Sequence, residues 1–278
     1  MLFLLRNVLF AGALAIAQAR SAGVAPLTSG KSPLAWASVA IHESDPTKDA
    51  TSWNSQANGV DIRGLGLKQL ISQGYDFSVT PFRDDEISGL PNWARSTRYD
   101  IVARVDTEDI PAFKKITDLS MQDTIAAFSA RQATGQMLMM QSLLTDRFHL
   151  KVHWEQKERA VYTLSVAKGG LRLQPAADTL HGSMMFSRGH LSGKGVPVSF
   201  LASLLEIPSD RTVSDMTGVT GSYDFDLRFD PADGAAETPS NDPNLFTALQ
   251  EQLGLKLQSS RASVPVLVVD HVERPTPN

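Results

Sequence analysis

The chain has 278 residues, 42% of them hydrophobic and 20% charged, enough for one large domain or two small ones with real cores. Its 26 Lys and Arg are scattered among 30 Asp and Glu, so the net charge of −4 argues against a nucleic-acid-binding face. The absence of cysteine excludes disulfides, a thiolate nucleophile, cysteine-ligated zinc and a lipid-anchored N-terminal cysteine.

The first 19 residues have the three parts of a secretory signal peptide. Arg6 is their only charge, residues 8–17 form a small apolar run, and Ala17-Gln18-Ala19 fits a cleavage site. The run is shorter than the roughly 20 residues that span a bilayer, and no later segment has the length and apolarity to do so. We expect cleavage after Ala19 and a periplasmic or secreted protein; the alternative is an uncleaved amphipathic N-terminus.

Residues 20–61 are predicted to form a Ser/Gly/Pro-rich leader and a first strand at 36–41. A first α+β copy is expected at 62–168, and it opens with a helix whose apolar residues follow helical spacing: Leu67, Leu70, Ile71 and Tyr75. A loop with Gly89, Pro91 and Trp93 leads to a strand at 99–105. In this loop the Trp93 indole is a candidate for ligand binding, and the alternative is a tryptophan that caps the core.

The remainder of the first copy starts with an insertion at 106–135. It is predicted to hold one helix, with a buried side formed by Met121, Ile125 and Phe128. A helix at 136–147 follows. Strict alternation predicts a strand at 149–154, and a second strand at 161–167 is expected to return beside it.

Residues 169–195 are predicted to be a linker to a second copy at 196–278. Pro197 suits the first turn of its helix, and a turn with Gly218 and Gly221 precedes a strand. The later elements follow in chain order: a strand at 223–229, a flexible loop at 231–243, a helix at 245–253, and strands at 255–258 and 266–269.

The two copies align without a gap from 144–168 onto 249–273. In each copy a glycine turn also precedes a Tyr-Asp pair, Tyr99-Asp100 and Tyr223-Asp224. We expect the tyrosine to fill the core while the aspartate tolerates the adjacent turn. The sequence thus predicts an α+β fold of two duplicated helix–strand–strand pairs, with mostly antiparallel sheets and helices on one face; convergent patterning is the alternative.

Two motifs for nucleophile or phosphate chemistry lack their required context. Residues 25–32 fit a loose phosphate-loop pattern, but no strand precedes them and Pro33 follows directly. Ser165 and Lys168 have the spacing of penicillin-recognising enzymes, which requires a helix, whereas this segment is predicted to end a strand. We therefore predict no catalytic residue and no cofactor at these motifs.

The histidines are better explained as exposed strand residues than as metal ligands. On a strand, His149 and His153 lie about 13 Å apart, too far to share one ion, so no metal site is predicted. Near the C-terminus, alternation places His271 and Glu273 on one face and Asp270 on the other, which prevents a simple catalytic relay. His271 is kept as a candidate binding residue.

Several segments together resemble a known family. They are residues 59–105 with Leu67-Lys68-Gln69-Leu70-Ile71, residues 140–168 with Leu143-Leu144-Thr145-Asp146-Arg147-Phe148, residues 213–227 with Gly221-Ser222-Tyr223-Asp224-Phe225, and the C-terminal segment with Leu253-Gly254-Leu255-Lys256-Leu257. The chain resembles a large paralogous family of exported proteins from soil Acidobacteria, a Solibacter-type domain of unknown function. The resemblance implies no activity and no catalytic residue, but related domains are sometimes joined to membrane metallopeptidase sensors.

Three functions are compatible with these observations. The first is a non-catalytic periplasmic or secreted module that binds a small molecule or an envelope protein, or that acts in sensing. The second is an envelope assembly module, because helix–strand–strand units that end in Leu-Gly-Leu-Lys-Leu look similar to small secretin and signalling domains. The third is a hydrolase with an unrecognised site, for which Ser165, Asp270 and His271 are the candidates.

Overall fold

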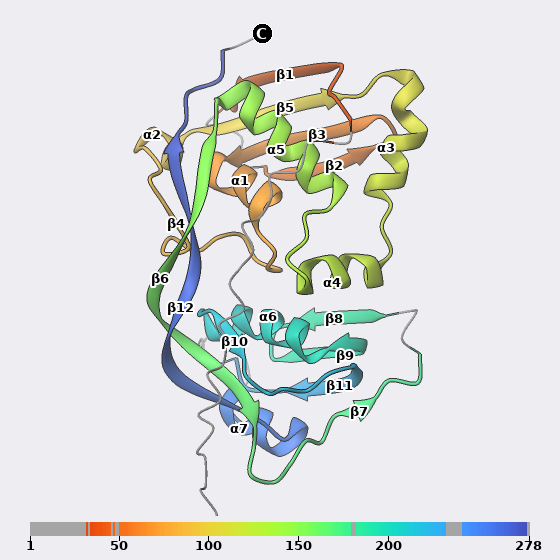
Figure 1. Cartoon of the computed structure of the whole chain (residues 1–278), viewed down its shortest axis with the longest axis vertical. Helices are drawn as coiled ribbons and strands as arrows, with labels where there is room; N and C mark the ends of the chain where they lie inside the picture. The colour runs from red at the N-terminus through yellow and green to blue at the C-terminus, as the bar shows by residue number, and fades with distance from the viewer. Residues whose placement is uncertain are drawn as a thin grey trace, which may run out of the picture.

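The computed structural model describes residues 32, 34–45, 47, 50–178, 182–231 and 241–276. They form an α+β structure of two lobes joined by one long two-stranded ribbon (Figure 1). The predicted signal peptide, the phosphate-loop pattern apart from Ser32 and most of the predicted loop at 231–243 lie outside the described residues. Within them, no helix has the length and apolarity to cross a bilayer.

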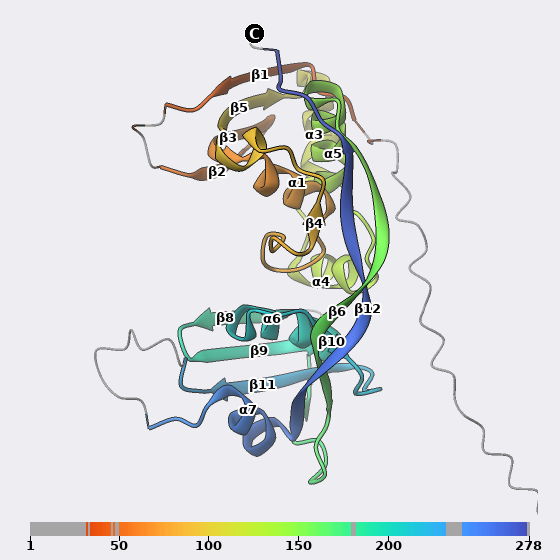
Figure 2. The same cartoon turned by 90° about the vertical axis from the view of Figure 1, so that its left-hand side faces the viewer.

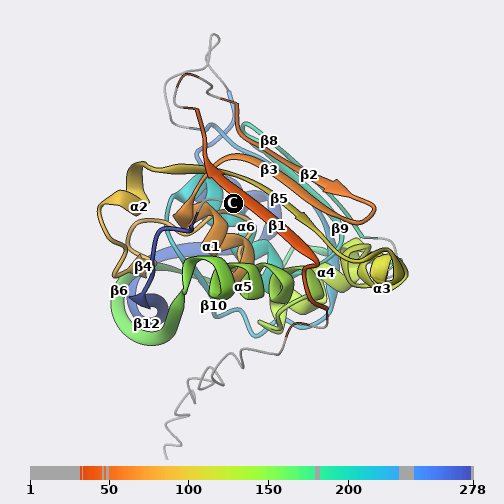
Figure 3. The ribbon, with the colours of Figure 1, turned by 90° about the horizontal axis from the view of Figure 1, so that it is seen from above.

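The first lobe is built on an antiparallel sheet with the strand order β1-β5-β3-β2. Its strands are β1 (Ser38–Glu43), β2 (Ser52–Gln56), β3 (Gly59–Gly66) and β5 (Arg98–Arg104). Its helices are α1 (Leu67–Tyr75), α2 (Trp93–Ser96), the 3-10 turn Thr107–Asp109, α3 (Ile110–Thr117) and α5 (Gly135–Phe148). Figure 3 shows α1 and α5 on the same side of this sheet, where their apolar faces close the core.

The second lobe has an antiparallel sheet with the order β7-β11-β9-β8. Its strands are β7 (Gln174–Pro175), β8 (Ser183–Ser187), β9 (His190–Pro197) and β11 (Ser222–Arg228). Its helices are α6 (Val198–Ser209) and α7 (Leu245–Ala248), which continues as the π-helical turn Leu249–Leu253. Helix α4 (Met121–Ser129) follows the first-lobe helices in sequence, yet it packs on α6 and buries Ile125 in the second core.

The ribbon consists of β6 (Lys151–Val166) and β12 (Leu255–His271), which pair antiparallel over nearly their whole length (Figure 2). Short strands extend it on both sides: β4 (Ile87–Ser88) is parallel to β12, and β10 (Val213–Asp215) is parallel to β6. The prediction of separate strands at 149–154 and 161–167 was wrong, as was the same prediction for 255–258 and 266–269. The polar stretches between them continue as strand, because each pairs with the other long strand.

Three further predictions differ from the structure. Residues 106–135 hold α3 and α4 instead of one helix, and Met121 is 45% exposed although Ile125 is buried. The predicted linker at 169–195 contains β7, β8 and most of β9. The β2–β3 and β8–β9 hairpins escape detection because their short strands are rich in glycine and polar residues, without strict alternation. His149 ends α5 with a φ of 50° instead of opening a strand.

Each lobe contains the same elements in the same order: a hairpin, a helix, a short strand on the ribbon, a returning strand and a helix that leads into a long ribbon strand. The register agrees with the sequence alignment. Ile87 pairs with Leu267, and Val213 pairs with Tyr162, the residue that aligns with Leu267. The short strands β4 and β10 thus occupy equivalent places on the ribbon. An origin of the two lobes by duplication stays a prediction.

The Tyr-Asp pairs occupy equivalent positions, but their aspartates do more than tolerate a turn. Asp100 Oδ1 accepts a hydrogen bond from the Gly64 amide at 2.8 Å, and Asp224 Oδ1 accepts one from the Gly195 amide at 2.9 Å. Both glycines have φ near +65°, at a bulge where the strand bends towards its helix. The tyrosines differ: Tyr99 is fully buried, whereas its equivalent in the second lobe is only partly buried.

We predict that Asp224→Ala lowers the free energy of unfolding by about 1–2 kcal/mol, because it leaves the Gly195 amide without its acceptor. Asp224→Asn keeps an oxygen at the same place and is expected to retain most of the stability. Urea denaturation of the three proteins tests this. Equal losses for the Ala and Asn variants would contradict the role assigned to the hydrogen bond.

Candidate functional site

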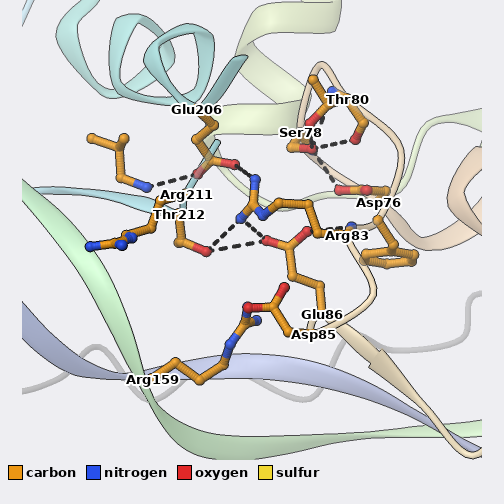
Figure 4. Close-up of polar contacts among 12 residues, drawn as sticks. Asp76, Ser78, Thr80, Arg83, Asp85, Glu86, Arg159, Glu206, Arg211 and Thr212 are labelled. Carbon is orange, nitrogen blue, oxygen red and sulfur yellow. Dashed lines mark hydrogen bonds and ion pairs between the residues drawn. The ribbon is translucent and has the colours of Figure 1, made fainter. Parts of the chain in front are cut away.

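A cluster of charged residues lies where the two lobes meet beside the ribbon (Figure 4). Its members are Arg83, Asp85 and Glu86 from the loop after α1, Glu206 from α6, Thr212 next to β10, and Arg159 from β6. We call these six residues the interlobe cluster. They come from both lobes and from the ribbon, so the cluster forms only in the folded chain.

Arg83 is the centre of the cluster. Its guanidinium donates to Glu206 Oε2 at 3.4 Å, to Thr212 Oγ1 at 2.7 Å and to Glu86. Thr212 Oγ1 in turn donates to Glu86 Oε1 at 3.2 Å. The side chains of the three ionic residues are at most 17% exposed, so their attraction is only weakly screened by water. Arg83 thus ties a loop of the first lobe to helix α6 of the second.

Glu206 is the one charged residue of α6, and it is buried, with 9% of its surface exposed. Its Oε1 accepts a hydrogen bond from the Val213 amide at 3.1 Å, which joins the end of α6 to β10. Burial raises the pKa of its carboxyl, although the Val213 amide and Arg83 oppose the shift. A buried carboxylate of this kind is tolerated because both of its oxygens have partners.

Arg159 attaches the ribbon to the same cluster through an ion pair with Asp85. Its guanidinium nitrogen Nη1 is buried, and among the described residues it has no hydrogen-bond partner. Burial lowers the pKa of Arg159, and the neighbouring charge of Arg83 lowers it further. The middle of the ribbon is thereby fixed to the first lobe by a charge pair instead of apolar packing.

A cleft of about 390 Å³ opens next to this cluster, between the loop after α1 and helices α4 and α5. Its walls combine apolar side chains with hydroxyl and amide groups, and they include Gln73, Asp76, Ser78, Val79, Thr80, Pro81, Thr117, Leu119, Thr124, Phe128, Thr134, Gln136 and Met137. Among the described residues that line the cleft, Asp76 is the one that carries a charge.

Asp76 directly follows α1 and begins the loop that carries the cluster. Its Oδ1 accepts a hydrogen bond from the Ser78 amide at 2.9 Å, whereas Oδ2 is buried without a partner among the described residues. Burial raises the pKa of Asp76 from 3.8 to about 7, and the Glu86 and Glu206 carboxylates contribute in the same direction. The side chain therefore changes charge near neutral pH.

Arg131 is a buried cation that is influenced by the charge of Asp76. It lies after α4 with a φ of 51°, and its guanidinium stands over the rings of Phe77 and Trp154 at 5.5 and 5.8 Å. Burial lowers its pKa, while the charges of Asp76, Glu206 and Glu86 oppose that shift. Asp76 Oδ2 in the cleft wall and Arg131 Nε outside the cleft lining are both buried without a hydrogen-bond partner among the described residues.

The predicted binding residues lie elsewhere. Trp93 opens α2, where it is half-buried against the first core, and Arg274 stands over its ring at 5.0 Å. His271 is an exposed residue at the end of β12, and its Nε2 lies 2.8 Å from Glu273. Asp270 instead faces His153, at 2.9 Å. The structure brings none of these residues into the cleft.

The other residues named from the sequence lie in turns or against neighbouring strands. Gly89, with a φ of 82°, brings the loop containing Pro91 so close to β12 that a Cβ would lie 2.3 Å from the Val269 oxygen. Gly218 and Gly221 have φ of 66° and 92° in open space before β11. Ser165 Oγ donates to the Lys256 carbonyl at 3.5 Å, and Lys168 lies beyond the end of β6. In the described part of the chain, no group of His, Asp and Glu side chains is arranged to hold a metal ion.

Two signals for the interlobe cluster are present in the sequence. Glu206 interrupts an apolar helical stripe, which marks it as a buried charge that needs a partner. Arg83, Asp85 and Glu86 belong to a short charged run between two buried residues, Phe82 and Ile87. These residues come together because the two lobes pack against each other. Their spacing in the sequence does not predict that they meet.

We predict that Arg83→Met costs about 3–5 kcal/mol of unfolding free energy, because Glu86 and Glu206 remain buried without their cation. Adding Glu206→Gln is expected to recover part of this loss, since an amide oxygen still accepts from Val213. A double-mutant cycle in urea measures the coupling. Additive effects of the two substitutions would contradict the role of this ion pair.

Asp76 makes stability depend on pH. The folded state holds its proton more tightly than the unfolded chain does, so this group stabilises the fold at acidic pH. Its contribution decreases as pH rises from about 4 to about 7. At about 1.4 kcal/mol per pKa unit, the upper bound is about 4 kcal/mol for a shift from 3.8 to about 7.

Asp76→Asn is therefore expected to gain stability relative to the wild type as pH rises, with a plateau above pH 7. The measurement is the unfolding free energy of both proteins between pH 5 and 8. Because the Glu206 carboxylate also raises the pKa of Asp76, the difference reports the titration of Asp76 together with its coupling to Glu206. A difference that is independent of pH would show that Asp76 does not titrate in this range.

Comparison with known proteins identifies a family for this chain. A family model described as "Protein of unknown function (DUF3738)" matches residues 68–272, a range that includes the whole interlobe cluster and all of the residues that line the cleft. No curated protein and no solved structure matches the chain. Because the match covers most of the chain, the protein belongs to the DUF3738 family of proteins of unknown function.

Proposed function

We propose that this chain is an exported, non-catalytic binding or sensory module that holds a small ligand in the cleft beside Asp76. The observation that carries the proposal is the position of the cleft. Helix α5 and the loop after α1 come from the first lobe, whereas α4 is packed into the core of the second lobe through Ile125. A ligand in this cleft contacts parts of both lobes at once.

The size and lining of the cleft support binding of a small organic molecule. About 390 Å³ is within the usual range for small-molecule sites, which combine apolar walls with a few polar groups. Here Val79, Phe128 and Met137 provide apolar surface, while Gln73 and Asp76 are polar. The described lining of the cleft contains serine and threonine hydroxyls and the Asp76 carboxyl but no histidine, lysine or cysteine, so Asp76 is the one side chain of this lining that could act as a general base.

A sensory role is supported by the proximity of the cleft to the interlobe cluster. Asp76 lines the cleft, and the Glu86 and Glu206 carboxylates of the cluster raise the pKa of its carboxyl. Ligand binding that changes the charge of Asp76 therefore alters the electrostatic balance between the lobes. The resemblance to exported proteins whose relatives are joined to sensors agrees with this role, as does the signal-peptide pattern at 1–19.

The test is a thermal-shift screen of the purified protein against cell-wall fragments, short peptides and sugars. A ligand that binds only the folded state, at 100 times its Kd, adds about 2.7 kcal/mol and raises Tm by roughly 5–10 °C. Gln73→Trp, which places an indole at the cleft, is expected to abolish the shift. The residue is exposed on α1, so the substitution preserves the core.

Ala126→Trp is the matched control, because Ala126 is exposed on α4 and is not part of the cleft lining. This variant is expected to respond to the ligand like the wild type. The proposal is wrong if no compound in the screen raises Tm, or if a compound that does so acts equally on Gln73→Trp.

A further inference from the structure

Strand β8 forms one edge of the second sheet and is paired on one side only. All five of its residues, Ser183 to Ser187, pair with β9. Among the described residues, no backbone group outside β9 hydrogen-bonds to β8. Its outer side therefore presents a row of amide and carbonyl groups that are available to another strand.

The side chains of β8 do not protect this edge. The strand reads Ser-Met-Met-Phe-Ser, without a charge or a proline, and it is regular, without a bulge. Met185 is 54% exposed and Phe186 is 45% exposed. Edge strands of soluble proteins are normally guarded by charges, prolines, bulges or covering elements, so this one is unusually open to strand addition.

Of the other edge strands of the two sheets, β1 and β7 are guarded. The Arg147 guanidinium donates to the Val39 carbonyl of β1 at 3.1 Å, and β1 also carries His42 and Glu43. Strand β7 has two residues, one of them a proline. Strand β2 is polar and has no exposed large hydrophobic residue, because its Trp53 packs against the core. Among the described edge strands of the two sheets, β8 is thus the one that combines exposed large apolar side chains with the lack of a charge, a proline and a bulge.

A trough of about 590 Å³ crosses the sheet next to this edge. Met185 pairs with Ser192, which pairs with Asp226, so these three residues share the outer face of the sheet. The trough is lined by them and by Lys194, Asp224 and Gln174, among others. Side chains of an added strand would therefore meet methionine first and polar groups further in, a combination that gives a strand-docking site its specificity.

The position of β8 determines what can occupy this edge. β8 is the strand of the second sheet that lies closest to the first lobe (Figures 1 and 2). A second folded copy that continued the sheet here would have to place its own strands where the first lobe stands. An extended segment is only one strand wide, so it adds to β8 without bringing further strands towards the first lobe.

We propose that β8 is a docking edge for an extended, largely apolar segment of a partner polypeptide, which adds to the second sheet as a fifth strand. Backbone hydrogen bonds to β8 provide the affinity. Side chains that alternate between Met185 on the outer face and Phe186 on the opposite face provide the selectivity. The site shares no residue with the cleft, so it is independent of the proposed small ligand.

The experiment is selection of a displayed library of random 12-residue peptides on the folded full chain. Selected peptides are expected to carry apolar residues at alternate positions and to slow amide hydrogen exchange within residues 183–187. Met185→Lys introduces the kind of charge that guards natural edges and is expected to weaken binding at least tenfold. Val102→Lys is the matched control, because Val102 is an exposed apolar residue on the interior strand β5.

Thermal melts establish that both lysine variants fold, and hydrogen exchange on the wild type tests the site without any substitution. The proposal is overturned if no peptide is enriched, if the enriched peptides protect segments other than β8, or if Met185→Lys binds them unchanged. A self-association of the chain that Met185→Lys abolishes, seen by sedimentation, would assign the edge to a second copy and also overturn it.

Discussion

The antiparallel pairing of β6 with β12 is the interaction on which the rest of the structure depends. One end of the ribbon supplies Leu267 and Val269 to the first core, and the other supplies Leu164, Leu255 and Leu257 to the second. Both cores are therefore completed by strands that run through the whole molecule. Neither lobe closes without them, because the helices and the smaller sheets pack against residues that only the ribbon provides.

Between the two cores, the side chains of the ribbon are polar. In this region the lobes are connected by ion pairs and not by apolar packing. Arg159 pairs with Asp85, and Arg83 joins Glu86 to Glu206. The two pairs of Arg83 are buried, whereas Asp85 is largely exposed. Buried ion pairs add less stability than apolar contacts, but removing one partner costs much stability because the other charge stays buried. They favour one defined arrangement of the lobes, and they make that arrangement sensitive to charges introduced nearby.

The two proposed sites depend on different features of this architecture. The cleft exists because α4 follows the first-lobe helices in sequence but packs on the second lobe, so that both lobes contribute to its walls. The open edge exists because the second sheet ends in an unguarded strand. A small ligand in the proposed cleft site would contact both lobes, whereas a peptide at the proposed edge would contact one sheet.

From the sequence alone, local patterns predicted the α+β class, the helix that begins at Leu67, the helix at 136–147, the core position of Tyr99 and the resemblance to a family of unknown function. These follow from local periodicity and from motifs, which neighbouring residues encode. Tertiary structure decided the continuity of the ribbon, the two hairpins, the interlobe cluster and the cleft. Residues 155–160 become strand only because β12 lies beside them, and Arg83 meets Glu206 only because two lobes pack together. Such contacts join residues far apart in the chain, and no local sequence pattern indicates which residues will meet.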